Sequence, residues 1–135
     1  YNWVVVEKRK LLLGKDAESI TAANKIRLLL SQVKAQNLIP NAFTDLVAFV
    51  NRNTEIEDGV DAFVQIRNSI VHSQSEKRKK LSNIPNRVKY EAQQLALWYI
   101  EVSLLYLFDF RGKFNNRGSG NAWEGEAEEE FSPIF

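Results

Sequence analysis

A chain of 135 residues that is 44% hydrophobic and 11% aromatic is long enough to bury a core, which excludes a disordered polymer. The absence of cysteine excludes a disulfide framework and a cysteine-ligated zinc or iron–sulfur site, and a single histidine argues against a dedicated transition-metal site. We therefore expect one globular domain that works without a cofactor and without a metal.

The net charge of +1 conceals a division along the chain. All 18 lysines and arginines lie at or before Arg117 together with 12 acids, so this part carries a charge of +6. The last 18 residues hold five glutamates and no basic residue. A basic body suggests a surface for a polyanion, and the acidic tail is then a segment that competes for it. A solvated charged surface with a disordered tail explains the same pattern.

The first segment, residues 1–13, has no clear period. Its β-branched run favours a strand, whereas the helical character of the following chain favours a helix, which is what we expect. No signal peptide is visible, so the cytoplasm is the default location. Because the chain lacks methionine and begins at Tyr1, we expect a C-terminal piece of a larger protein whose N-terminal sensor region is missing.

Two amphipathic helices are predicted next. The first starts after Asp16, a suitable N-cap, and runs to about residue 38, ahead of Pro40. The second spans about residues 41–52, and an acid-rich connection follows it. Their apolar faces are Ile26, Leu29, Leu30 and Val33 in the first helix, and Phe43, Leu46, Val47 and Val50 in the second.

The last helix is predicted from about residue 86 to 110, opened by Pro85 and ended by Gly112. Its section 95–110 is apolar on almost every side. Three polar residues interrupt it: Glu101, Ser103 and Asp109. The remaining apolar runs are shorter than the ~18 residues of a membrane span, so we expect no membrane contact. This helix is then the centre of a bundle, or it also packs against a second subunit.

The sequence thus predicts an all-α protein, a bundle of about four to five helices with a long apolar last helix. Residues 1–117 form the helical domain, and residues 118–135, which begin with a glycine-rich link, form a flexible acidic tail.

The central helix, predicted over residues 60–72, contains a conflict. Its apolar stripe consists of Val60, Phe63, Val64, Ile70 and Val71. Arg67 falls in the middle of this stripe, where a guanidinium is costly unless it is paired; Glu101 is a candidate partner. On an ideal helix His72 lies about 40° from Asn68 but about 140° from Arg67. Either the helix ends between Arg67 and His72, or the arginine curls around, or the site draws these residues from two chains.

These residue types can cut RNA without a metal. His72 can act as a base or an acid near neutral pH, Arg67 offers a forked charge for phosphate oxygens, and Asn68 can orient the histidine or bind the phosphate. The simpler interpretation is a structural ion pair and an ordinary surface or core histidine.

A basic cluster follows at Lys77, Arg78, Lys79 and Lys80. This cluster fits contact with the RNA backbone or a solvated loop equally. Three aromatic residues, Tyr90, Trp98 and Tyr99, can stack on unpaired bases, although core packing suits them better.

The segment Arg67-Asn68-Ser69-Ile70-Val71-His72 resembles the Arg-Asn-x-x-x-His signature of HEPN (higher eukaryotes and prokaryotes nucleotide-binding) domains, small helical bundles of bacterial defence systems. It is most similar to the C-terminal HEPN domain of ApeA-like abortive-infection (anti-phage defence) proteins. A second block, over residues 97–101, 108–113 and 115–117, follows in the same order. The resemblance covers roughly residues 16–117.

This resemblance implies a HEPN-like bundle and a metal-independent endoribonuclease (a hydrolase) of a bacterial defence or toxin protein. HEPN nucleases work as dimers or as paired domains, so for this chain it implies a homodimer whose two motifs line one cleft, acting on single-stranded or looped RNA. The implied catalytic residues are Arg67, Asn68 and His72, and the implied RNA-binding residues are Lys77, Arg78, Lys79 and Lys80. The alternative is a non-catalytic HEPN-type module that binds a nucleotide or a partner, or that only dimerises.

Overall fold

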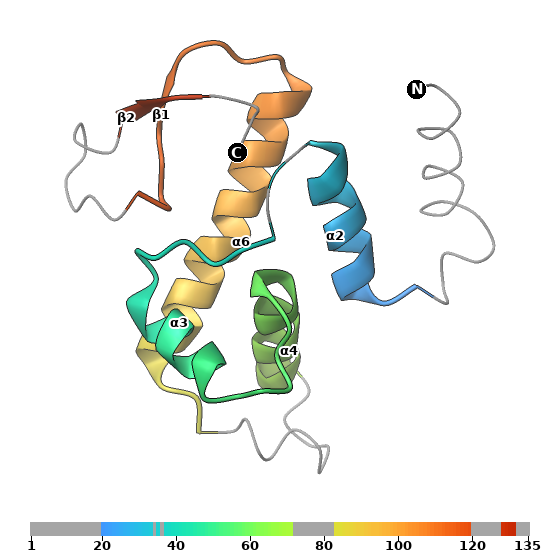
Figure 1. Cartoon of the computed structure of the whole chain (residues 1–135), viewed down its shortest axis with the longest axis vertical. Helices are drawn as coiled ribbons and strands as arrows, with labels where there is room; N and C mark the ends of the chain where they lie inside the picture. Colours follow the sequence, from blue (N-terminus) through green and yellow to red (C-terminus); the bar gives the residue numbers. More distant parts are fainter. Residues whose placement is uncertain (1–19, 34, 36, 72–82, 120–127, 132–135) are drawn as a thin grey trace.

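The computed structural model describes residues 20–33, 35, 37–71, 83–119 and 128–131. The elements in these ranges are the helices α2 (Ala22–Gln32), α3 (Thr44–Asn51), α4 (Gly59–Val71) and α6 (Asn86–Leu107), followed by the strands β1 (Lys113–Asn115) and β2 (Glu128–Glu130). This part of the chain is mostly helical, which confirms the broad all-α prediction. Figure 1 shows α6 running along the longest dimension, with α2, α3 and α4 around it.

The core lies where the three shorter helices meet α6, since α2, α3 and α4 each contact it and α2 also contacts α4. The largest fully buried side chains are Leu30, Val33, Leu46, Val60, Ile66, Leu95 and Val102. Burying one such aliphatic side chain stabilises the fold by about 1.5–3 kcal/mol. The apolar positions predicted for the first two helices are thus partly confirmed, although Leu29 remains exposed.

Helix α2 is shorter than the sequence predicted. The Thr21 hydroxyl accepts a hydrogen bond from the Asn24 amide at 3.2 Å and caps its first turn. At its other end, the Ala35 amide donates to the Leu30 carbonyl at 3.0 Å, a bond typical of a closed helix end. The prediction that Asp16 caps this helix, and that it continues to about residue 38, was therefore wrong.

Helix α3 lies within its predicted range and takes its cap from another helix. Its N-cap residue is Phe43, whose side chain has no hydrogen-bonding group. The Leu46 amide in the first turn donates instead to Oε2 of Glu91, on α6, at 2.7 Å. Glu91 is only 5% exposed. A buried carboxylate of α6 thus holds the start of α3, because free amides and the helix dipole favour a negative charge there.

Helix α6 ends in a Schellman-type motif at an aspartate. Asp109 adopts a left-handed conformation with φ of 47°. Its amide donates to the Tyr106 carbonyl at 3.1 Å, and the Phe110 amide donates to the Leu105 carbonyl at 2.9 Å. Aspartate tolerates this conformation better than most residues. The prediction that Gly112 ends the helix was therefore wrong.

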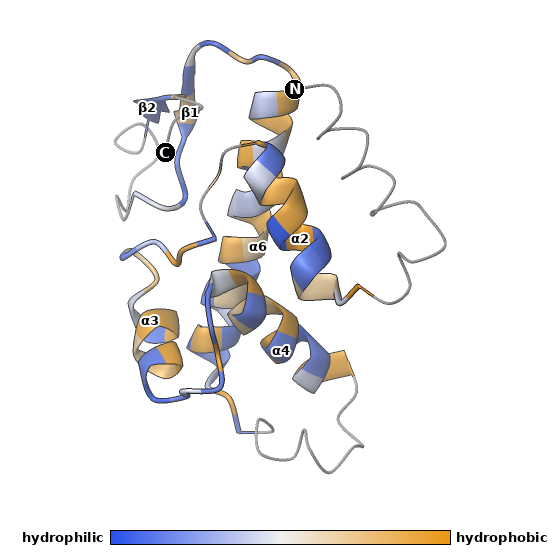
Figure 2. Cartoon of the chain, turned by 45° about the vertical axis from the view of Figure 1, so that its right-hand side comes forward, coloured by the Kyte–Doolittle hydropathy of each residue, from blue (hydrophilic) through white to orange (hydrophobic). Residues whose placement is uncertain are grey.

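A small antiparallel sheet follows α6, which the sequence did not predict. Lys113 pairs with Glu130, so that opposite charges face each other. The Phe114 and Phe131 rings meet edge to face with centroids 5.6 Å apart. Strand β2 is hydrophilic throughout (Figure 2). It lies within the segment 118–135 that we expected to be a flexible tail, yet it pairs with a strand of the predicted domain 1–117.

Residues 1–13 lie outside the described ranges, so the helix or strand expected there is not tested. Among the helices of the described ranges, none combines the length and the apolar character needed to cross a membrane.

Candidate functional site

Arg67 lies at the surface of α4, whose observed bounds match the predicted helix closely. The residues of α4 that are buried in the bundle are Gly59, Val60, Ala62, Ile66 and Ser69. By contrast, Ile70 and Val71 are 56% and 55% exposed, and Arg67 is exposed. The predicted apolar stripe was therefore wrong in its second half. Arg67 needs no buried partner, because its charge remains in contact with solvent.

The contacts of Arg67 are few. Its Nη1 donates to Oδ1 of the neighbouring Asn68 at 3.1 Å, and it forms no ion pair with any residue that the structure describes. The expected pairing with Glu101 was wrong. Glu101 instead accepts two hydrogen bonds from Nε of Arg117, at 2.7 and 2.8 Å. Among the described residues, no acidic side chain pairs with the positive charge of Arg67.

Arg67 lines a groove of about 500 Å³ between α4 and α6. The groove surface is mainly apolar, and Ile70 and Val71 are among the residues that line it; the C-terminal end of α4 is hydrophobic in Figure 2. From α6 it receives Lys89 and Tyr90. The described residues that line it include two cations and no acid. Such a groove suits a ligand that is partly apolar and negatively charged.

Asn68 faces a different hollow. It lines a space of about 440 Å³ between α2 and α4, together with Arg27, Asp61 and the residues of the Thr21 cap. Arg67 and Asn68 therefore touch through their side chains but border two hollows. Asn68 can orient the guanidinium of Arg67, because its amide oxygen already accepts a hydrogen bond from it.

The other predicted site residues are not tested. His72 and the basic cluster Lys77, Arg78, Lys79 and Lys80 lie outside the described residues. Whether His72 joins Arg67 and Asn68 in one site therefore stays a prediction. Across the described ranges, no group of three His, Cys, Asp or Glu side chains is arranged to hold a metal ion.

Of the three aromatic residues proposed for base stacking, two belong to the core. Trp98 and Tyr99 are 7% and 5% exposed. The Trp98 indole donates to Oδ1 of Asn116 at 2.9 Å, and the Tyr99 hydroxyl donates to the Leu38 carbonyl at 3.2 Å. Burial raises the pKa of Tyr99, and the nearby charge of Asp58 adds to this effect. Only Tyr90 of the three, at 59% exposed, presents its ring to solvent.

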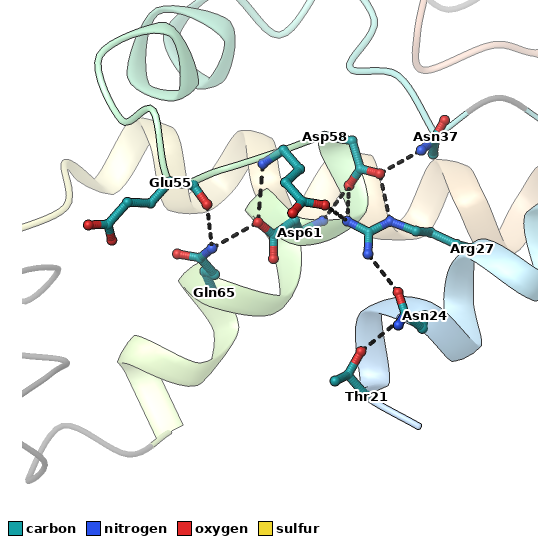
Figure 3. A network of polar contacts seen from close by, with 9 residues as sticks. Thr21, Asn24, Arg27, Asn37, Glu55, Asp58, Asp61 and Gln65 are labelled. Carbon is teal, nitrogen blue, oxygen red and sulfur yellow. Dashed lines mark hydrogen bonds and ion pairs between the residues drawn. The ribbon is translucent and has the colours of Figure 1, made fainter. Parts of the chain in front are cut away.

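A polar network at the start of α4 was missed by sequence reasoning (Figure 3). Nε and Nη2 of Arg27 donate to the two carboxylate oxygens of Asp58 at 2.7 and 3.0 Å. Asp58 also accepts from the Asn37 side chain at 2.5 Å and from the Asp61 amide at 2.8 Å. The last bond makes Asp58 the N-cap of α4. The network therefore stabilises the start of the helix that carries Arg67. The only sign of this network in the sequence was an aspartate directly before an apolar helical pattern.

The electrostatics of this network favour the ion pair. Burial raises the pKa of Asp58, but hydrogen bonds from Arg27, Asp61 and Asn37 together hold it below its usual value. The hydrogen bond to Asp58 raises the pKa of Arg27 against the opposing effect of burial. Both groups are therefore charged at neutral pH.

Asn116 and Arg117, within the second block of the sequence resemblance, connect the C-terminal strands to α6. Asn116 accepts the Trp98 indole hydrogen bond and donates to Oε2 of Glu129 at 2.7 Å. Arg117 bonds Glu101 and also donates to Oε1 of Gln94 at 2.8 Å. These contacts place both residues in structural roles.

Comparisons with known proteins place this domain. A family model for the YopA C-terminal domain matches residues 1–129. The chain is similar to the SPbeta prophage-derived uncharacterized protein YopA of Bacillus subtilis (strain 168), with 26% identity over 116 residues. The aligned region is 85% of this chain but 24% of that protein, so the chain spans about a quarter of the relative's length. No solved structure matches. The chain belongs to the YopA C-terminal domain family.

Proposed function

We propose that this domain is a metal-independent endoribonuclease of the HEPN type, part of a larger cytoplasmic defence or toxin protein. Its site would combine Arg67, Asn68 and His72 across a homodimer. The Arg-Asn-x-x-x-His motif supports this function, and the prophage origin of the Bacillus subtilis relative is compatible with a role in phage–host conflict.

The observation that best supports the proposal is the exposure of the Arg67 side chain. Its guanidinium is exposed at the edge of a groove, and among the described residues it is bound only by Asn68. Arg27 of α2 differs, because its guanidinium is paired with Asp58. An exposed guanidinium held by a neighbouring amide is suited to phosphate oxygens.

The proposed reaction is attack of a ribose 2′-hydroxyl on the adjacent phosphorus. A base removes the 2′-hydroxyl proton as the bond from O2′ to phosphorus forms. The bond from phosphorus to O5′ breaks, and an acid protonates the leaving O5′, which yields a 2′,3′-cyclic phosphate and a free 5′-hydroxyl. Arg67 would stabilise the charge of the pentacoordinate intermediate, and His72 would serve in proton transfer. One histidine per chain cannot fill both proton roles easily, whereas a dimer supplies two.

The surface of α6 supports the dimer. Four apolar residues recur on one side of it at helical spacing and remain exposed: Ile100, Leu104, Leu107 and Phe108. Leu107 and Phe108 are 65% and 79% exposed. We call these four residues the α6 stripe. A stripe of this kind commonly marks a surface that another protein covers, and a second copy of the same helix would bury both stripes at once.

The decisive experiment incubates the purified domain with total RNA in EDTA. We expect fragments that end in 2′,3′-cyclic phosphate, and their loss in His72→Ala and in Arg67→Ala. Arg52→Ala is the matched control, because Arg52 is also an exposed arginine but is the C-cap residue of α3, outside α4. Absence of cleavage by the wild type, or equal cleavage by His72→Ala, would remove the nuclease proposal for this domain.

The α6 stripe also favours a second candidate, a non-catalytic module that dimerises or binds a partner. In that case the domain associates through α6 but leaves RNA intact. The same cleavage assay, combined with a measurement of molecular mass in solution, separates the two functions.

A further inference from the structure

We propose that the groove between α4 and α6 binds an unpaired nucleotide, with its base stacked on Tyr90 and its flanking phosphates bound by Arg67 and Lys89. This inference rests on the proposed ribonuclease function. It adds residues of α6 that the motif does not contain, and it commits the substrate to single-stranded RNA.

The residues that line the groove match the chemistry of single-stranded RNA. Its surface is mainly apolar, and the charged residues found among its described lining are Arg67 and Lys89, one from each helix. A base offers an apolar face, and the phosphates on either side of it offer negative charges. A single strand of RNA therefore matches an apolar groove with a cation on each wall.

Tyr90 provides the stacking surface. Tyr90 is 59% exposed although it lines the groove, and Trp98 and Tyr99 of the same helix are buried. An exposed aromatic ring beside cations is the arrangement on which bases stack in proteins that bind single strands. The burial of the other two rings means that their loss would damage the core, whereas a change at Tyr90 should leave the fold intact.

Two amides complete the groove. Asn86 and Gln93 line it from α6 on either side of Tyr90 in the sequence. A side-chain amide carries both donors and an acceptor and can therefore hydrogen-bond to the edge of a base. Those edges are accessible only when the base is unpaired, and duplex RNA keeps its bases stacked inside. The groove thus favours single strands over duplexes.

Fluorescence anisotropy with a labelled, 2′-O-methylated oligouridine tests the inference, because this probe binds but offers no 2′-hydroxyl for cleavage. We expect Tyr90→Leu, which keeps an apolar side chain without a ring, to weaken binding about 5- to 150-fold, the range of one base–aromatic stack. Tyr90→Phe keeps the ring and should bind like the wild type. Lys89→Gln and Arg67→Gln should each reduce the slope of log affinity against log salt by about 0.7. Arg52→Gln and Lys113→Gln, exposed cations outside the groove, should leave the slope nearly unchanged.

The outcomes separate this inference from the nuclease proposal. Unchanged binding by Tyr90→Leu overturns the groove inference, and cleavage of unmodified RNA by the same variant leaves the nuclease proposal standing. Loss of binding in Tyr90→Leu without any cleavage by the wild type supports the groove and overturns the nuclease. A preference for duplex RNA, or binding of an acidic amphipathic peptide with no binding of the oligonucleotide, overturns the groove inference. Circular dichroism of Tyr90→Leu and Lys89→Gln confirms that each variant is folded.

Discussion

The carboxylate of Asp58 joins two helices through a single residue, Arg27, whose guanidinium donates to both of its oxygens at 2.7 and 3.0 Å. Arg27 belongs to α2, and Asp58 caps α4 through the Asp61 amide. The position of α4, and with it Arg67, therefore depends on this pair. Side chains of Arg27 and Asp58 are 25% and 13% exposed, so solvent screens the pair only in part.

Asp58→Ala should lower the free energy of unfolding by about 2.5–4 kcal/mol, because an N-cap contributes about 1 kcal/mol and a hydrogen bond to a charged group about 1.5–3 kcal/mol. Urea unfolding followed by circular dichroism measures the change. The control is Asp45→Ala, which breaks the exposed pair of Asp45 with Arg87 and should cost about 0–1 kcal/mol. Equal losses in the two variants would contradict a special role for Asp58.

The same carboxylate predicts a dependence of stability on pH. Its pKa is held below the usual value of 3.8 in the folded state, so the folded protein binds this proton less readily than the unfolded chain. Its contribution is then fully present above about pH 5 and is lost as the pH falls through the folded pKa. The wild type should therefore lose stability more steeply below about pH 4 than Asp58→Asn, which cannot titrate. Urea midpoints measured from neutral to acidic pH give both curves, and parallel curves throughout would contradict the prediction.

The sequence predicted the helices of the centre of the chain well, because a period near 3.6 is visible wherever one face is buried. The phase of α4 was harder to predict. Its core face uses Ala62 and Ser69, small residues that allow close packing, whereas the large Ile70 and Val71 are exposed. A prediction based on the large apolar residues therefore assigned the wrong face of α4 to the core and placed Arg67 within that face.

Contacts between distant segments were beyond sequence reasoning. Arg117 rather than Arg67 pairs with Glu101, and spacing along one helix carries no information about a partner beyond its end. The end of α6 illustrates a related limit. Glycine favours a left-handed conformation, which suggested Gly112, but Asp109 adopts it because the Schellman bonds determine the position. Strand β2 needs β1 as its partner, and three consecutive glutamates give no local signal for a strand.

Gly59 should not tolerate a side chain. A Cβ atom there would collide with the Tyr99 hydroxyl and would lie 3.0 Å from both the Asn37 carbonyl oxygen and a side-chain carbon of Ile39. Gly59→Ala should destabilise the protein by about 1–3 kcal/mol, the usual cost of overpacking. In a Tyr99→Phe background the closest clash is removed, so the same substitution should cost less. Urea unfolding of the four proteins of this double-mutant cycle measures the difference, and an equal cost in both backgrounds would show that the hydroxyl does not matter.

A single charged substitution in the α6 stripe tests the dimer proposal. Leu104 lies within the stripe and is 46% exposed, so Leu104→Glu should leave the stability of the monomer almost unchanged. Burying the same glutamate between two copies would cost several kcal/mol. Analytical ultracentrifugation should therefore find a dimer for the wild type and a monomer for Leu104→Glu. Leu38→Glu, at a residue that is 60% exposed but lies outside the stripe, should remain a dimer.

Cleavage by the same proteins links association to activity. If the site requires two copies, Leu104→Glu should lose RNA cleavage together with dimerisation, and Leu38→Glu should retain both. A wild type that stays monomeric at every concentration would contradict the dimer. A monomeric Leu104→Glu that still cuts RNA would instead show that one chain is sufficient, because a single Arg67 and a single His72 would then perform the reaction without a partner.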